Sequence, residues 1–153
     1  MHLYMVQHGE AKSAEADPAR GLTPKGTADV QKVADHLGKL KLGVSIIYHS
    51  GKTRASETAS ILTAELKPVK GSIEGEGLGP QDDPRIWQER LNTIDEDVIL
   101  VGHLPHLRRL MSLLLCGDSE KGVVHFRQGG MVCLERVEND WSLEWAVTPG
   151  LFL

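Results

Sequence analysis

The sequence predicts an α/β fold with three layers, in which helices cover both faces of a mostly parallel central sheet. Short apolar runs rich in strand-forming residues (3–6, 44–48 and 97–101) alternate with longer segments whose apolar residues recur every three or four positions. After residue 117 the helical spacing gives way to strand-like runs. A turn at residues 138–140 joins the last two of them, which adds an antiparallel hairpin at one edge of the sheet.

The N-terminal half contains two of the predicted strand–helix units. The run 3–6 ends in the polar tip 7–10, and an exposed loop follows over residues 11–20. Thr23 is a suitable N-cap and Pro24 a suitable first residue for a helix that ends near Gly38 or Gly43. The run 44–48 also ends in polar residues, and a second helix begins there and stops before Pro68.

The C-terminal half begins with a long loop at residues 71–84, which holds four glycines and two prolines and follows a short strand near 69–73. Asp83 and Pro84 introduce a third helix, and the strand 97–101 leads to a fourth helix that starts at Pro105 and ends at Gly117. The remaining predicted strands cover residues 123–126, 130–137 and 141–147.

Length and composition exclude several classes of protein. We expect one domain over residues 1–153. The net charge of −4 argues against binding to nucleic acid or to an anionic membrane, and no apolar stretch is long enough to span a bilayer. The N-terminus lacks the pattern of a signal peptide. Cys116 and Cys133 have apolar neighbours and no metal-ligand spacing, so we expect reduced structural thiols in a cytoplasmic protein.

Three polar side chains follow three different predicted strands: His8, Arg54 and His103. Because the carboxyl ends of parallel strands meet at one edge of a sheet, these side chains are expected to converge. A neutral histidine is a nucleophile and a proton carrier near pH 7, and arginine binds phosphate through a planar fork of donors. The combination indicates phosphoryl transfer through a phosphohistidine. A metal site is the alternative, but arginine belongs beside an anion and no carboxylate joins the two histidines at short spacing.

Four blocks of sequence carry a resemblance to a known family. The blocks are residues 7–10 (QHGE), 20–26 (RGLTPKG), 50–58 (SGKTRASET) and 102–105 (GHLP), and the C-terminal stretch 145–150 (WAVTPG) is also similar. In this order and spacing they resemble the histidine phosphatase superfamily, above all its short SixA-type phosphohistidine phosphatases. The resemblance covers the whole chain and implies the phosphoglycerate mutase-like fold.

The resemblance also implies a role for each residue of the site. His8 matches the nucleophile, and Arg54 and His103 match the residues that hold the phosphate oxygens. Gly9 and Arg20 match substrate-binding positions, with Arg20 at the mouth of the pocket. We expect a metal-independent protein without a cofactor. Gln7 departs from the family, which has arginine there, and its amide donates a hydrogen bond without bringing a charge.

The leaving group favours one substrate class. Phosphate esters need a carboxylic acid to protonate the departing oxygen, and the candidates in the long loop match no motif: Glu74, Glu76, Asp82 and Asp83. A protonated imidazole has a pKa near 6.5, so the ring can depart as a neutral group more readily than an alcohol can. We therefore expect a phosphatase that acts on a phosphohistidine-bearing protein, for example of a phosphorelay, and releases phosphate. The alternatives are a small-molecule phosphomonoesterase and a phosphate-binding module that lost turnover with the arginine.

Overall fold

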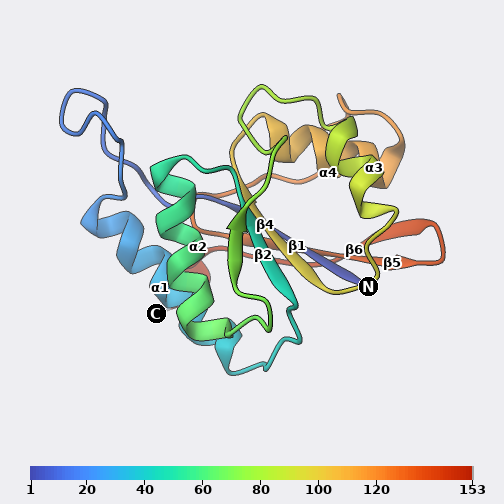
Figure 1. Cartoon of the computed structure of the whole chain (residues 1–153), viewed down its shortest axis with the longest axis horizontal. Coiled ribbons are helices and arrows are strands. Elements are labelled where there is room, and N and C mark those ends of the chain that lie inside the picture. Colours follow the sequence, from blue (N-terminus) through green and yellow to red (C-terminus); the bar gives the residue numbers. More distant parts are fainter. Residues whose placement is uncertain (153) are drawn as a thin grey trace.

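The computed structural model describes residues 1–152, which form one six-stranded sheet with helices on both faces (Figure 1). The strands are β1 (His2–Gln7), β2 (Ile46–His49), β3 (Ser72–Glu74), β4 (Val98–Gly102), β5 (Met131–Val137) and β6 (Asp140–Val147). The helices are α1 (Pro24–Gly38), α2 (Thr53–Leu66), α3 (Arg85–Leu91) and α4 (His106–Cys116), and a 3-10 turn follows β6 at Pro149–Leu151. No helix among these is long and apolar enough to cross a membrane.

The strand order is β3-β2-β4-β1-β5-β6. The first four strands in this order are parallel to one another, whereas β5 runs antiparallel to both β1 and β6. The prediction of a mostly parallel sheet with an antiparallel C-terminal hairpin at its edge is therefore confirmed. Strand β1 occupies the centre, so that Val6 pairs with Val101 on one side and with Met131 on the other.

Two apolar cores lie on opposite faces of the sheet. Tyr4 and Val6 of β1 face the core that α1 and α2 cover, and Leu3 and Met5 face the core that α3 and α4 cover. Figure 1 shows the two pairs of helices on either side of the sheet. Because side chains alternate along a strand, both faces of β1 are buried, which explains why its sequence is a continuous apolar run.

The strand predicted at residues 123–126 does not form, and this prediction was wrong. The segment has the expected alternation, since Val123 is exposed and Phe126 is buried, but it has no strand to pair with. It leads instead to Gly129, whose N–H donates to the carbonyls of Gln7 and His8 at 2.9 and 3.3 Å. The segment thus passes the end of β1, where both neighbours of that strand are already taken by β4 and β5.

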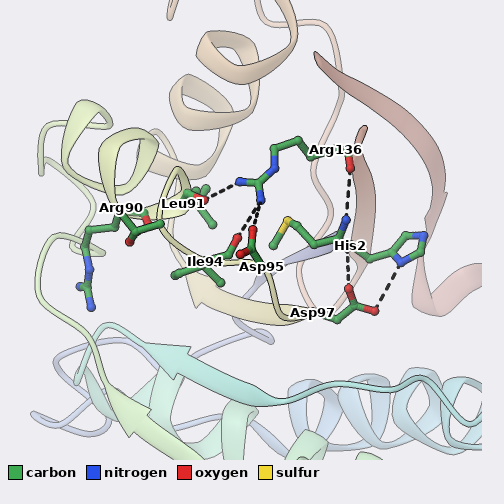
Figure 2. Close-up of polar contacts among 9 residues, drawn as sticks. His2, Arg90, Leu91, Ile94, Asp95, Asp97 and Arg136 are labelled. Carbon is green, nitrogen blue, oxygen red and sulfur yellow. Dashed lines mark hydrogen bonds and ion pairs between the residues drawn. The ribbon is translucent and has the colours of Figure 1, made fainter. Parts of the chain in front are cut away.

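Arg136 ties β5 to the end of α3 (Figure 2). Its guanidinium donates to the carbonyls of Leu91 and Ile94 at 2.6 and 2.9 Å and to the carboxylate of Asp95 at 3.1 Å. In the same view, the side chain of Asp97 accepts a hydrogen bond from the backbone of His2 at 2.6 Å. These contacts lie at the amino ends of β1 and β4, opposite the edge where the candidate site lies.

Candidate active site

The structure brings His8 and His103 together where β1 and β4 end. His8 follows the last residue of β1, and its N–H donates to the carbonyl of Gly102 at 3.1 Å. The centroids of the two imidazole rings lie 5.0 Å apart, with the ring planes inclined by 53°. Parallel pairing of β1 with β4 therefore places two chemically active side chains side by side, as the sequence predicted.

The contacts of His8 leave one ring nitrogen free for chemistry. Its Nδ1 lies 2.6 Å from the carbonyl oxygen of Gly9. Because a carbonyl only accepts, Nδ1 carries the proton and Nε2 keeps its lone pair. Burial lowers the pKa of His8, and the positive charges of Arg54 and Arg20 lower this pKa further. The hydrogen bond to Gly9 acts in the opposite direction but is the smaller effect. The imidazole is therefore held in its neutral, nucleophilic form at pH 7.

His103 is also buried and neutral. Its Nε2 lies 2.6 Å from the hydroxyl of Ser50, which follows β2. Burial lowers the pKa of His103 to about 3, and the neighbouring His8, Arg54, Lys52 and His106 add to this effect. A negatively charged group in the pocket would act in the opposite direction and favour the protonated ring.

Arg54 lies in the first turn of α2, at the carboxyl edge of the sheet. No side chain caps this helix, and the first intrahelical bonds are donated by Ala55 and Ser56 to the carbonyl of Lys52. The earlier N–H groups of the turn are left for a ligand, as in other anion sites at helix N-termini. Burial lowers the pKa of Arg54, and the charge of Arg20 adds to it, so two guanidinium groups share the electrostatic field of the site.

Thr58 links Arg54 to the loop that follows His8. Its hydroxyl donates to the carbonyl of Arg54 at 2.8 Å and accepts from the N–H of Gly9 at 3.1 Å. Thr58 is fully buried. The helix that presents Arg54 and the turn that follows His8 are thus held in one arrangement by a single side chain.

Close backbone contacts fix the start of α1 against the loop after β1. Thr23 caps the helix by accepting from the N–H of Gly26 at 2.9 Å, as predicted, and its own N–H donates to the carbonyl of Glu10. A Cβ on Gly26 would overlap the backbone of Glu10, and one on Gly9 would lie 2.9 Å from Val30. Both positions need glycine because two backbone segments pass at contact distance.

The structure places the other predicted binding residues as follows. Gln7 is the last residue of β1 and is half-buried, and its side-chain amide makes no hydrogen bond to any of residues 1–152. Arg20 is exposed, has a φ of 52°, and donates from Nε to the carbonyl of Lys12 at 3.1 Å. An isolated antiparallel bridge between Ala11 and Leu22 closes this loop at its base.

Sequence reasoning gave no role to three buried or half-buried residues of this region: Ser50, Thr58 and His106. Ser50 and Thr58 lie inside a matched block, but only the folded chain shows which partners their hydroxyls have. His106 is fully buried, and neither of its ring nitrogens has a hydrogen-bond partner among the described residues. Burial lowers the pKa of His106 as well. Its position two residues after a motif leucine was the only available signal.

The four candidate acids lie in different surroundings. Asp82 accepts from the N–H of Gly79 at 2.7 Å, and Asp83 pairs with Arg85 at 2.8 Å. The carboxylate of Glu74, at the end of β3, lies against the backbone of Gly51, one residue after the Ser50 that contacts His103. Residues 1–152 contain no group of three or more His, Cys, Asp and Glu side chains arranged to hold a metal ion.

Comparisons with known proteins show which family the chain is similar to. A family model described as histidine phosphatase superfamily (branch 1) matches residues 3–76. An uncharacterized protein of Picosynechococcus sp. is 31% identical over an alignment 159 residues long. The alignment covers 94% of this chain and 94% of that protein.

Solved structures share the fold. The protein histidine phosphatase SixA complexed with tungstate superposes with a TM-score of 0.88 at 21% identity, over 99% of both chains. A mutant phosphoserine phosphatase from Entamoeba histolytica in complex with phosphoserine superposes with a TM-score of 0.76 at 15% identity, again over 99% of both chains. The fold expected from the resemblance is thus confirmed.

Proposed function

Because this chain belongs to the histidine phosphatase superfamily, we propose that it removes the phosphoryl group from phosphohistidine in another protein, through an intermediate phosphorylated on His8. The observation that carries this proposal is the pair of buried, neutral histidines 5.0 Å apart, with Arg54 in the helix turn beside them. A nucleophile, an anion-binding turn and a second imidazole are the parts that phosphoryl transfer needs.

The first step forms a bond between Nε2 of His8 and phosphorus and breaks the bond between phosphorus and the substrate imidazole. The departing imidazole takes up a proton. In the second step water attacks phospho-His8, a phosphorus–oxygen bond replaces the phosphorus–nitrogen bond, and inorganic phosphate leaves. A covalent intermediate divides one difficult displacement into two easier ones.

Arg54 and the N-terminus of α2 stabilise the negative charge on the transferring group. His103 acquires its function when the phosphoryl group enters, because the anion offsets the burial and the positive neighbours that keep its pKa low. The protonated ring then donates to a phosphate oxygen. Thr58 keeps Arg54 and the turn after His8 in register and acts as a positioning residue.

The substrate class follows from the leaving group. Two of the four candidate acids are engaged, Asp82 with a backbone N–H and Asp83 with Arg85. An imidazole leaving group requires no acid stronger than solvent, whereas an alcohol does. The solved relative complexed with tungstate is described as a protein histidine phosphatase, which supports the same class.

The test compares two substrates, a protein phosphorylated on histidine with phosphoramidate and p-nitrophenyl phosphate, with and without chelator. We expect higher kcat/KM on the phosphoprotein and no effect of chelator. An alkaline quench should trap a base-stable, acid-labile phosphoryl group on the wild-type protein and on the control His36→Ala, but not on His8→Ala. Turnover by His8→Ala at the parent rate would overturn the nucleophile, and loss of activity to chelator would indicate a metal.

Glu74 supports a second candidate, a phosphomonoesterase for small molecules, because its carboxylate lies beside the loop that contacts His103. The fold is shared with a phosphoserine phosphatase structure that holds phosphoserine. If this candidate is correct, Glu74→Gln lowers turnover of phosphoserine strongly and leaves turnover of phosphohistidine unchanged. Uniform loss on both substrates would count against it.

A further inference from the structure

The segment at residues 121–128 joins α4 to β5 and borders the candidate active site. Gly129, which follows it, donates to the carbonyls of Gln7 and His8. On its other side Val124, His125 and Phe126 share a hollow of about 330 Å³ with Leu104, the neighbour of His103. One end of the segment is therefore followed by a residue that contacts His8, and its middle lies beside the residue that follows His103.

Its composition differs from that of the whole molecule. The chain carries a net charge of −4, yet no acidic residue occurs between Lys121 and Leu134. Lys121, His125 and Arg127 are exposed, and Arg108 of α4 lies against the backbone of Gly122. None of the three cations Arg108, Lys121 and Arg127 belongs to an ion pair among residues 1–152. The adjoining turn carries two acidic residues. Glu120 pairs with Arg109 at 3.7 Å, and Asp118 accepts from the N–H of Glu120 at 2.9 Å.

The same surface also carries exposed apolar side chains and backbone N–H groups that have no hydrogen-bond partner among the described residues. Val123 is 51% exposed and Leu104 is 36% exposed. No backbone N–H from Val123 to Gln128 donates a hydrogen bond to any described residue. Beyond Arg127, a second hollow of about 400 Å³ continues the basic surface with Lys25 and Lys32, although Asp29 pairs with Lys25 there. A small apolar centre within a charged rim is the usual composition of a transient protein interface.

We propose that residues 121–128, together with Leu104 and Arg108, form a docking surface for the acidic face of the protein that brings its phosphohistidine to His8. This inference rests on the proposed function and adds the chemistry of the partner to it. Unpaired cations beside the pocket attract an acidic partner and orient it, which raises the association rate. The backbone N–H groups that have no partner among the described residues can donate to side-chain carboxylates of that partner.

The test reverses the charge of two exposed residues whose side chains make no hydrogen bond or ion pair to any described residue, in the double variant Lys121→Glu/Arg127→Glu. The matched control is Lys39→Glu/Lys41→Glu. These lysines are exposed and follow α1, a 15-residue helix that begins beside Glu10 and carries the chain roughly 22 Å away from the site. The substrates are free phosphohistidine, an acidic phosphocarrier protein and a basic histone, both proteins phosphorylated with phosphoramidate.

We expect the double variant to lose about ten-fold or more in kcat/KM on the acidic phosphoprotein at low salt. Its activity on free phosphohistidine and on the histone should not fall, and the control should change on no substrate. The advantage of the wild type should shrink as ionic strength rises. Equal loss on the acidic protein and on free phosphohistidine would place these residues in the pocket rather than in a docking surface. No loss on the acidic protein would overturn the proposal.

A binding measurement separates this inference from the proposed function. The same acidic protein, titrated by calorimetry into His8→Ala with and without the double charge reversal, reports docking in the absence of turnover. Weaker binding after charge reversal supports the docking surface even if the wild type hydrolyses no phosphohistidine, in which case only the proposed function fails. Unchanged affinity overturns the docking surface whatever the activity.

Discussion

Gln7 leaves Arg54 as the main guanidinium of the candidate site. The amide of Gln7 brings no charge to the end of β1, and Arg20 is exposed on its loop. Arg54, half-buried in the first turn of α2, is therefore the main cation that can face a transferring phosphoryl group.

The first prediction compares these two neighbours of the pocket. Removing a donor aimed at developing charge typically costs about 10²–10³ in rate. Arg54→Gln is expected to lower kcat/KM on phosphohistidine by that amount, and Gln7→Ala by less, because it removes a neutral donor. Steady-state kinetics of both variants checks the order. Small and equal losses would mean that Arg54 is only a charge on the helix surface.

Restoring the family arginine is the second prediction. A hydrogen bond from a charged donor contributes roughly 1.5–3 kcal/mol, against about 0.5–1.5 kcal/mol for a neutral donor. Gln7→Arg should thus stabilise the transition state by roughly 1–2 kcal/mol, or about five- to thirty-fold in kcat/KM. If the parent protein has no activity and the Gln7→Arg variant gains it, the natural protein is a phosphate-binding module. A loss would mean that the pocket suits a less charged substrate, and phosphohistidine would have to be withdrawn.

At the scale of elements, the loop after β1 and the start of α1 behave as one unit. Gly26 packs directly on the backbone of Glu10, and Gly9 packs on Val30 of the same helix. This packing holds His8 in place, because neither the loop nor the first turn of the helix has room to shift.

The third prediction tests that packing with a matched pair of glycines. A Cβ on Gly26 meets backbone atoms that cannot turn away, so Gly26→Ala should lower the free energy of unfolding by about 2–3 kcal/mol and reduce activity. Gly43→Ala is the control, since nothing lies within 4 Å of its added Cβ. Its effect should stay below about 1 kcal/mol. Urea unfolding of both variants gives the comparison, and similar values would refute the argument.

The elements differ in how well the sequence predicts them. Local patterns are enough to predict β1, α1 and β4, because periodicity and capping residues act over a few neighbouring positions. Thr23 caps α1 as expected. Residues 123–126 show the limit of this reasoning. Their alternation is real, but a strand exists only where a neighbour is free, and that depends on the whole sheet.

At the scale of the molecule, Arg136 joins parts of the chain that are distant in sequence. The fourth prediction is that Arg136→Lys lowers the free energy of unfolding by about 2 kcal/mol, because an ammonium cannot serve the carbonyls of Leu91 and Ile94 together. The control Arg85→Lys changes only an exposed ion pair and should cost less than about 1 kcal/mol. Equal losses in thermal or urea unfolding would contradict the assignment.

The buried histidines make stability depend on pH. The pKa of His103 falls from 6.5 to about 3 on folding, and those of His8 and His106 are also lowered. The unfolded chain therefore binds more protons below pH 6.5, and stability is full above that pH and falls as the pH drops toward 3.

The fifth prediction is that the free energy of unfolding decreases between pH 7 and pH 5, and that it decreases less in His103→Gln. Carboxylates remain largely ionised in this window, so the difference isolates histidine. Urea titrations at the two pH values measure it. An equal decrease in the free energy of unfolding for the variant and the parent would show that His103 is not held neutral by the fold.

The positions of the candidate site residues could be predicted from sequence, and their connections could not. His8, Arg54 and His103 follow three elements that a parallel sheet must bring to one edge, so topology alone gathers them. The contacts of Ser50 and Thr58 and the burial of His106 depend on packing between elements that are far apart in the chain. No local pattern encodes those contacts.

The central position of β1 has a consequence for the protein during its synthesis. The strand is translated before the other five strands, and its two neighbours, β4 and β5, begin only at Val98 and Met131. At about 5–20 residues per second, the interval between Val6 and its partner Met131 lasts roughly 6–25 s. Both edges of β1 stay open until β4 has been translated, and the edge that pairs with β5 stays open for the whole interval, so this apolar strand is exposed to chaperones. His8 cannot meet His103 until residues 9–103 have been translated.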